Sequence, residues 1–128
     1  MNTPTVINIL FVLVVVWFVY NRFGPSKGLR NLGAKEFETE MAKSPDRILV
    51  DVREPNEYKS GRILGAQNIP LSQLSQRLKE LPKDKDVFLY CRSGMRSKSA
   101  ARILLKNGYT KLTHLQGGIS SWKSKVSN

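Results

Sequence analysis

The sequence predicts an α/β domain built on a parallel sheet and preceded by one transmembrane helix. Two strongly apolar runs, residues 48–50 and 87–89, alternate with segments of helical period in the polar part of the chain. Continuous apolar runs of this kind are typical of strands buried on both faces. The first 21 residues carry no charged side chain, whereas the other 107 carry all 21 basic and all 10 acidic residues. A segment of this length is sufficient for one hydrophobic core, so a single domain is expected.

Residues 3–23 are predicted to cross a membrane as a helix. Their length just reaches the roughly 20 residues that a bilayer core requires, and only a helix satisfies the backbone groups of a single segment in lipid. Trp17, Tyr20 and Phe23 would form an aromatic belt at the carboxyl end. A cleaved signal peptide is the alternative, but the segment has no basic residue before its apolar core and no small-residue cleavage site. We therefore expect residues 1–23 to remain as an anchor.

The basic residues that follow the apolar segment predict its orientation. Those closest to its carboxyl end are Arg22, Lys27, Arg30 and Lys35. Because such residues accumulate on the cytoplasmic side of membrane proteins, the globular domain is expected to face the cytoplasm. Residues 24–28 contain Gly, Pro and Ser and are expected to be a short tether that holds the domain, residues 29–128, near the cell membrane.

The formal net charge of +11 raises the question of a nucleic-acid partner. Clustered basic residues supply most of the non-specific affinity for nucleic-acid phosphates, and they also attract a domain to anionic lipid headgroups. A basic domain tethered to a membrane is explained by the second effect. We therefore expect the lipid bilayer as a partner and expect no nucleic acid.

The domain is expected to open with a strand, a helix and a second strand. Residues 29–32 fit an edge strand. Residues 34–43 fit a helix that ends before Pro45, because the residue before a proline avoids the helical region. Residues 48–52 form an almost continuous apolar run, which predicts a buried strand.

The middle of the domain is expected to contain one helical turn, a strand and a covering helix. Residues 55–59 fit a helical turn closed by Gly61, and residues 66–69 fit a short strand. Leucines then recur at intervals of three and four, which predicts an amphipathic helix packed on the sheet. These leucines are Leu71, Leu74, Leu78 and Leu81.

The last part of the chain continues the alternation of strands and helices. Residues 87–90 fit the second strongly apolar strand. After a loop, apolar residues at helical spacing predict a helix that finishes at residue 106 and is capped by Gly108. Residues 111–115 fit a last strand. A terminal helical segment containing Trp122 is expected to pack against the domain.

Cys91 follows a buried strand and precedes a helix, and ligands bind at such junctions in open α/β sheets. The backbone N–H groups of such a loop converge on an anion, and the helix dipole adds partial positive charge. This setting lowers the pKa of a cysteine, so Cys91 is expected to be a nucleophilic thiolate. The alternative is a small buried hydrophobic side chain. Gly94, Arg92 and Arg96 favour the nucleophile, because they open the loop to a ligand and supply positive charge.

One cysteine and one histidine are present, and these counts exclude several chemistries. Cys91 cannot form an intrachain disulfide, a cysteine-cluster metal site or a redox pair. His114 leaves little from which to build a serine triad or a zinc site, and it is expected to be an ordinary strand residue. We therefore expect no metal and no cofactor.

Four blocks of sequence carry a resemblance to a known family, and they cover nearly everything after the tether. The blocks are residues 51–58, residues 61–63 with 65–70, residues 91–97, and Gly117-Gly118 with Trp122. In content and order they resemble single-domain sulfurtransferases of the rhodanese-like family. The resemblance implies a three-layer fold with a five-stranded parallel sheet and helices on both faces. One departure is Arg62, where members of the family commonly have histidine.

The resemblance also implies a reaction. The cysteine of such a protein takes sulfane sulfur from a donor, becomes a persulfide and passes the sulfur to a nucleophilic acceptor. Cys91 would be the catalytic nucleophile and the persulfide carrier. Cysteine phosphatases are the nearest competitor, but they have one residue more between cysteine and arginine than the four between Cys91 and Arg96. The shorter loop suits a terminal sulfur better than a tetrahedral phosphate.

The rest of the loop is expected to bind the substrate. Its residues are Arg92, Ser93, Gly94, Met95, Arg96 and Ser97. Their backbone amides would stabilise the thiolate and the terminal sulfur. Arg96, with Arg92, would hold an anionic donor such as thiosulfate, and Ser97 would cap the helix. Asp51 and Arg53 follow a neighbouring strand and are expected to be a supporting hydrogen-bonded pair.

The expected partners are a small-molecule sulfur donor and a thiophilic acceptor. Because the chain has one cysteine, the Cys91 persulfide has to be discharged by an outside thiol, cyanide or a biosynthetic acceptor, which includes an acceptor protein. The alternative function is a membrane-tethered binding or scaffold module with the same fold and no sulfur-transfer turnover. The intact Cys91 loop favours the enzyme.

Overall fold

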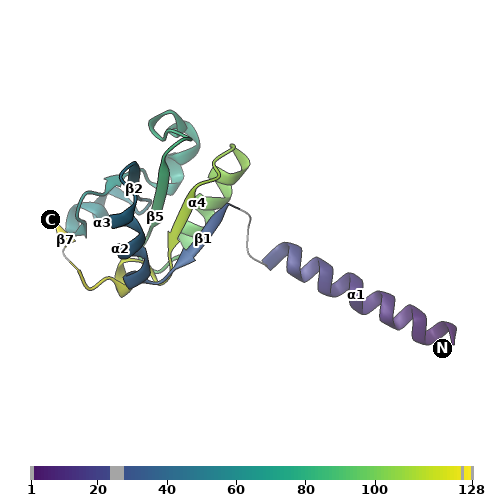
Figure 1. The fold of residues 1–128 in the computed structure, drawn as a ribbon. Helices are drawn as coiled ribbons and strands as arrows, with labels where there is room; N and C mark the ends of the chain where they lie inside the picture. The colour runs from purple at the N-terminus through teal and green to yellow at the C-terminus, as the bar shows by residue number, and fades with distance from the viewer. Residues whose placement is uncertain (1, 24–27, 125, 128) are drawn as a thin grey trace.

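A parallel sheet of five strands, in the order β1-β6-β5-β2-β4, forms the middle of the domain (Figure 1). The computed structural model describes residues 2–23, 28–124 and 126–127. The strands are β1 (Leu29–Leu32), β2 (Arg47–Asp51), β4 (Gln67–Asn68), β5 (Asp86–Tyr90) and β6 (Leu112–Leu115). Every neighbouring pair runs parallel. The α/β class and the five-stranded parallel sheet are therefore confirmed.

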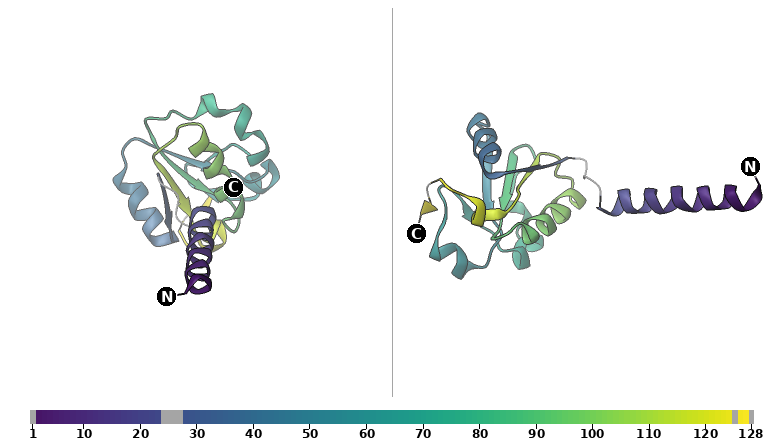
Figure 2. Two further views of the ribbon diagram at one scale, coloured as in Figure 1. Left: turned by 90° about the vertical axis from the view of Figure 1, so that its right-hand side faces the viewer. Right: turned by 90° about the horizontal axis from the view of Figure 1, so that it is seen from below.

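Helices lie on both sides of the sheet (Figure 2). They are α2 (Ala34–Lys43), α3 (Pro55–Ser60) and α4 (Met95–Lys106). Both β1 and α2 have the bounds that the sequence predicts. α3 starts with Pro55, at a position where a backbone N–H would have no acceptor within the helix, so the proline costs no hydrogen bond. Glu54 and Glu57 form a capping box at this end.

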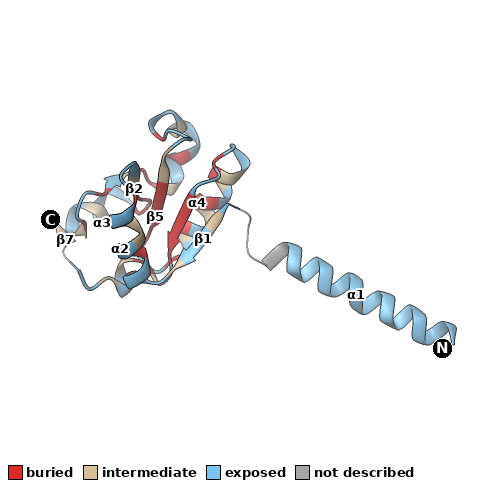
Figure 3. Cartoon of the chain, in the orientation of Figure 1, coloured by how far each residue is buried: buried red, intermediate tan, exposed pale blue. Residues whose placement is uncertain are grey.

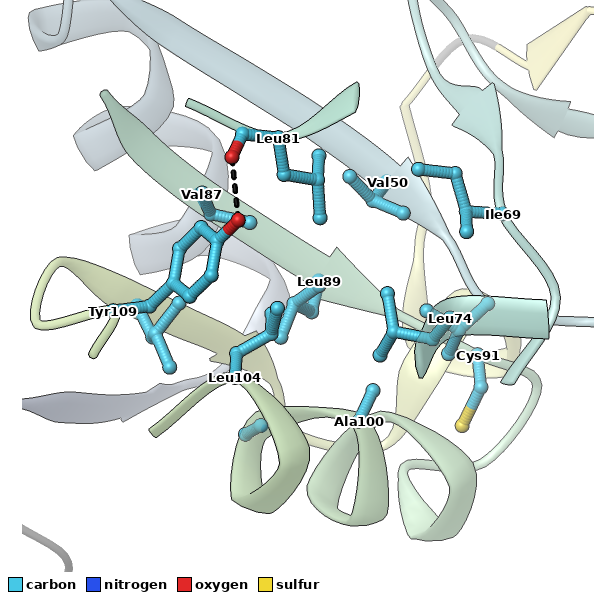
Figure 4. Packing of buried hydrophobic residues seen from close by; sticks show 13 residues of the cluster. Val50, Ile69, Leu74, Leu81, Val87, Leu89, Cys91, Ala100, Leu104 and Tyr109 are labelled. Carbon is cyan, nitrogen blue, oxygen red and sulfur yellow. Dashed lines mark hydrogen bonds between the residues drawn. The ribbon is translucent and has the colours of Figure 1, made fainter. Parts of the chain in front are cut away.

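β5 is apolar on both faces because each face packs on its own cluster of side chains. Along β5, Val87 and Leu89 share one cluster with Cys91, whereas Phe88 and Tyr90 belong to the other. All five are at most 1% exposed. Figure 4 shows the first cluster, in which Cys91 lies near Leu74 and near Ala100 of α4. Because β5 is the central strand, Cys91 lies buried at the carboxyl end of the sheet.

The opposite face is closed by aromatic packing on α2. Phe37 is fully buried, and its ring meets that of Phe88 edge to face with 5.2 Å between centroids. The ring of Trp122 meets Phe37 in the same way at 6.1 Å. Phe37 therefore joins α2, β5 and the carboxyl-terminal segment, and Figure 3 shows how burial concentrates in the sheet between the helices.

The leucine-rich segment differs from the predicted single α-helix. It forms two 3₁₀ helices, η1 (Leu71–Gln76) and η2 (Leu78–Glu80). Leu74 and Leu81 are buried, as the leucine spacing indicates. The Tyr109 hydroxyl lies within hydrogen-bond distance of the carbonyl oxygens of Leu78 and Leu81. This tertiary contact fixes the end of the segment, where the chain follows tight turns rather than a continuous α-helix.

The carboxyl-terminal segment also differs from the predicted helix. Its elements are η3 (Gly118–Ser121) and β7 (Val126–Ser127), which pairs antiparallel with β3 (Arg62–Ile63). Trp122 follows η3 and is not part of a helix. The sequence analysis predicted neither β3 nor β7, because strands of two residues have no detectable periodicity. α4 is capped by Asn107, and Gly108 follows it with a left-handed φ of 89°.

α1 (Thr3–Phe23) occupies the residues predicted to cross a membrane. Among the described residues it is the one helix long and apolar enough to do so, and residues 3–21 are exposed throughout. These features fit a membrane span and also a signal sequence. Residues 24–27 of the expected tether lie outside the described residues.

Replacing Phe37 with alanine is expected to lower the free energy of unfolding by about 3–5 kcal/mol, because it removes a fully buried ring and two edge-to-face contacts. Glu38→Ala, at an exposed position of α2, is the control and should change it by less than about 0.5 kcal/mol. Urea unfolding of the full-length chain in detergent, followed by near-ultraviolet circular dichroism, measures both. Equal stability of the two variants would contradict this account of the core.

Candidate active site

The chain turns from β5 into α4 within four residues, 91–94. Gly94 is the N-cap residue of α4 and has a left-handed φ of 111°, which other residues rarely adopt. A Cβ atom at this position would also lie only 3.4 Å from Cε1 of His114. Because the turn is this short, Arg96 and Ser97 lie within the first turn of α4 rather than in an extended loop.

The sulfur of Cys91 is buried and is surrounded by hydrogen-bond donors. The backbone N–H of Gly94 donates to Sγ over 3.0 Å, and the Ser97 hydroxyl lies 3.6 Å from Sγ. Burial raises the pKa of the Cys91 thiol, but hydrogen bonds from the Ser97 hydroxyl and from the backbone of Ser97, Gly94 and Ser93 outweigh it. The pKa therefore lies below its ordinary value, which favours the nucleophilic thiolate.

Ser97 does not cap α4, contrary to the expectation from the sequence. The N-cap residue is Gly94, and Ser97 lies three residues further along the helix. The Ser97 hydroxyl lies 3.2 Å from the carbonyl oxygen of Gly94 and 2.6 Å from Nδ1 of His114. The hydroxyl thus connects the loop, α4 and β6 instead of covering a free helix end.

His114 is placed at the site, although the sequence analysis treated it as an ordinary strand residue. It lies on β6 opposite Leu89 of β5 and is 1% exposed. Burial, with a smaller effect from the positive charge of Lys98, lowers the pKa of His114 to about 4. No local pattern indicates this position, because it results from the pairing of β6 with β5 and from the path of α4.

Arg96 is held by a carboxylate that the sequence analysis did not assign to the site. Its Nη1 and Nη2 donate to the two carboxylate oxygens of Glu57 over 2.6 and 2.9 Å. This bidentate hydrogen bond is the main reason that the pKa of Glu57 is lowered to about 2. Glu57 belongs to one of the sequence blocks described above, but only the fold brings α3 to the start of α4.

Asp51 and Arg53 form the hydrogen-bonded pair expected from the sequence, and both are buried. Nε and Nη2 of Arg53 donate to the Asp51 carboxylate over 2.7–3.0 Å. Nη2 also donates to the carbonyl oxygen of Gly61. The guanidinium carbon lies 5.7 Å from the ring centroid of Tyr90, the last residue of β5. The pair therefore fixes the segment after α3 against the strand that leads to Cys91.

The remaining residues of the loop have exposed side chains, and their backbone is hydrogen-bonded to η3. Arg92, Ser93 and Met95 all have exposed side chains. The carbonyl oxygen of Arg92 accepts hydrogen bonds from both the N–H and the hydroxyl of Ser120. Gly118 has a left-handed φ of 61°, and a Cβ atom there would collide with the backbone of the loop. This close approach explains the glycine at 118, whereas Gly117 has its own left-handed φ of 80° and a Cβ atom there would meet the Ser121 side chain.

The donors around the Cys91 sulfur suit a negatively charged ligand. They are backbone N–H groups, a hydroxyl and the amino-terminal end of a twelve-residue helix. Among residues 2–23, 28–124 and 126–127, no three His, Cys, Asp or Glu side chains gather so that they could hold a metal ion. The arrangement can hold a thiolate, or a sulfur atom bonded to it, within reach of a reacting partner.

Comparison with known proteins places these features in a family. A relative from Bacillus subtilis, the uncharacterized protein YqhL, is 40% identical over 121 residues, which is 94% of each chain. A protein of Allochromatium vinosum named sulfurtransferase is 37% identical over 73% of this chain and 88% of its own length. The crystal structure of a rhodanese-related protein from Thermoplasma volcanium matches with a TM-score of 0.69 and 32% identity, over 77% of this chain and 97% of that one.

The family model that matches describes a Rhodanese-like domain and covers residues 33–125. This range contains the sheet from β2 onward, the Cys91 loop, Glu57 and the glycine pair. The relatives that match over most of their length include proteins named sulfurtransferase. The chain is therefore a member of the rhodanese family, and its Rhodanese-like domain follows the apolar amino-terminal helix.

Proposed function

We propose that the protein is a membrane-anchored sulfurtransferase that carries sulfur on Cys91. The observation that carries the proposal is the Cys91 sulfur, which faces the Gly94 N–H at 3.0 Å and the Ser97 hydroxyl at 3.6 Å at the start of α4. These donors favour a thiolate at neutral pH. Related proteins named sulfurtransferase support the same reaction class.

The reaction proceeds in two displacements. With thiosulfate as the donor, the Cys91 thiolate attacks the outer sulfur atom, the sulfur–sulfur bond of the donor breaks, and sulfite leaves with the bonding electrons. The product is a Cys91 persulfide with a negative terminal sulfur. A thiol, cyanide or a biosynthetic acceptor then attacks that sulfur, and the Cys91 thiolate is restored.

The loop backbone stabilises the negative sulfur in both displacements. Hydrogen bonds from the backbone of Ser93, Gly94 and Ser97 lower the pKa of the resting thiol, and the exposed faces of the loop leave room for a donor. Donors fixed before the reaction need no reorganisation as charge develops, which is the main advantage of such a cradle. Asp51 and Arg53 support it by holding the end of β5 in place.

Arg96 and Arg92 are proposed to bind the oxyanion part of the donor. The guanidinium of Arg96 has five N–H donors, and the bidentate contact with Glu57 uses two nitrogen atoms, so part of the group stays free for a ligand. Glu57 neutralises much of the positive charge of Arg96. The affinity for a doubly charged donor therefore depends on Glu57 as well as on the arginines.

We propose that α1 anchors the protein in the cell membrane with the domain in the cytoplasm. The helix has the length and composition of a membrane span. Arg30 and Lys35 follow it in the domain, and basic residues at that position favour a cytoplasmic location. The formal net charge of +11 would keep the domain close to anionic headgroups.

Incubation of the full-length protein in detergent with excess thiosulfate is expected to add the mass of one sulfur atom at Cys91. Cyanide should remove it and yield thiocyanate, because the terminal sulfur is electrophilic. Intact-protein mass spectrometry and a thiocyanate assay measure the two steps. Cys91→Ser should abolish both while the circular dichroism spectrum stays unchanged. A folded wild-type protein that forms no persulfide would instead support the binding or scaffold module.

Removing the negative charge of Glu57 is expected to improve the use of thiosulfate. Glu57→Gln should raise kcat/KM for thiosulfate about fivefold, since a partly exposed charge contributes on the order of 1 kcal/mol. Arg96→Ala should lower it by roughly tenfold and should affect an uncharged organic polysulfide much less. Arg102→Ala removes an exposed arginine later on α4 and is the matched control. Equal losses of Arg96→Ala with both donors would exclude an oxyanion contact.

The anchor predicts that carbonate extracts a chain beginning at Gly28 from membranes but not the full-length chain. For orientation, single cysteines introduced by Asn2→Cys or Lys123→Cys in a Cys91→Ser background are treated with a membrane-impermeant thiol reagent. In intact cells the reagent should label position 2, whereas position 123, which is exposed, should react only after the membrane is opened. The reverse pattern would place the domain outside the cell.

A further inference from the structure

Three buried side chains form a row beneath the turn into α4. Ser97 Oγ lies 3.6 Å from Cys91 Sγ and 2.6 Å from Nδ1 of His114. The three residues come from different elements, since Cys91 follows β5, Ser97 belongs to α4 and His114 belongs to β6. Each residue is at most 1% exposed, so the row is shielded from solvent. The direction of the hydrogen bonds in the row is therefore set by these three groups and by the carbonyl oxygen of Gly94, which lies 3.2 Å from Ser97 Oγ.

The Ser97 hydroxyl has one proton and several neighbouring acceptors. If Nδ1 of His114 carries no proton, the contact of 2.6 Å requires the hydroxyl to donate to it, and no proton is left for Cys91. If Nδ1 carries a proton, it donates to Ser97 Oγ, and the hydroxyl proton can point either to the sulfur at 3.6 Å or to the carbonyl oxygen of Gly94 at 3.2 Å. The tautomer of His114 thus decides whether Ser97 can stabilise a thiolate.

His114 is unsuited to the alternative role of a general base. Burial, with a smaller contribution from Lys98, lowers the pKa of its imidazole to about 4, so the ring is neutral at neutral pH. The charged side chains that face the row are Lys98 and Arg96, both on α4. Transfer of the thiol proton to His114 would create a buried positive charge beside them. A neutral ring that donates a hydrogen bond avoids this cost.

We propose that His114 is a positioning residue for Cys91: its Nδ1–H donates to Ser97 Oγ and thereby directs the Ser97 hydroxyl proton to the sulfur. The proposal rests on the proposed sulfur transfer for its purpose, since it is the attacking and restored thiolate that the hydroxyl stabilises. His114 itself touches neither the donor nor the reacting sulfur. Its effect on Cys91 passes through Ser97.

The His114 ring also packs against the turn, so a test has to separate its volume from its hydrogen bond. A Cβ atom on Gly94 would lie 3.4 Å from Cε1 and 3.6 Å from Nε2 of the ring. His114→Asn retains an N–H donor one bond beyond Cγ, as Nδ1 is, but loses part of the ring. His114→Leu retains a buried apolar side chain and loses the donor. The two variants therefore change volume and hydrogen bonding in different combinations.

The pKa of Cys91 is the direct measurement of this role. Because the chain has one cysteine, labelling with cysteine that carries ¹³C at Cβ gives a single signal that moves as the thiol ionises. In a pH titration of the full-length protein in detergent, His114→Leu is expected to raise the pKa of Cys91 by up to about one unit, because the Ser97 hydroxyl is no longer oriented by Nδ1–H and can turn from the sulfur to the carbonyl oxygen of Gly94. His114→Asn should raise the pKa of Cys91 by no more than about a third of that amount.

Ser97→Ala provides the test that the effect passes through Ser97. It should raise the pKa of Cys91 by a similar amount, and adding His114→Leu to Ser97→Ala should cause no further rise. The proposal is overturned if His114→Leu has the pKa of the wild type, or if it causes the same shift with and without Ser97. It is also overturned if His114→Asn and His114→Leu shift the pKa equally, because volume alone would then explain the effect.

The tautomer can be observed directly in the wild-type protein, which keeps the proposal testable if His114→Leu does not fold. With one histidine in an untagged chain, ¹⁵N-labelled histidine gives one pair of ring signals. We expect a neutral ring with the proton on Nδ1 between about pH 6 and 8, and a proton on Nε2 alone would overturn the proposal. Neither measurement requires turnover, so failure of sulfur transfer with the expected pKa shifts would refute only the proposed function.

Discussion

The burial of the Cys91 sulfur among hydrogen-bond donors is the constraint on which the rest of the site depends. Cys91 is 1% exposed, and burial by itself disfavours the thiolate. The charge is tolerated only where several donors meet the sulfur at once. The left-handed Gly94 provides this by turning the chain so sharply that its own N–H and the first turn of α4 face the same atom. A wider turn would separate these donors from the sulfur.

The parallel sheet positions the residues that support the loop, because the carboxyl ends of all its strands lie on the same side. Asp51 ends β2, Cys91 follows β5 and His114 lies near the end of β6, and β5 is paired with both neighbours. Asp51 holds Arg53 against Tyr90, while His114 lies next to Ser97. The support of the loop therefore comes from both sides of the strand that carries Cys91, together with η3 beneath it.

The positive charge of the arginines near Cys91 is partly neutralised by a carboxylate. Arg96 lies beside the sulfur but forms a bidentate pair with Glu57, whereas Arg92 has an exposed side chain. The pair fixes the geometry of Arg96 and at the same time reduces the positive potential that a donor meets. The proposed preference among sulfur donors of different charge therefore rests on this pair rather than on the cysteine.

The sequence by itself determined the fold class and the elements 29–32 and 34–43, and it singled out Cys91 as the candidate nucleophile, because apolar periodicity, proline positions and the setting of Cys91 are local signals. It also indicated that Asp51 and Arg53 form a pair. Only the tertiary structure decided the rest. The leucine-rich segment forms two 3₁₀ helices, the second of which contacts the Tyr109 hydroxyl, and β3 pairs with β7 although neither has a pattern of its own. Glu57 and His114 reached the site through the packing of α3 and the pairing of β6, and contacts between residues 17–39 positions apart leave no trace in local sequence.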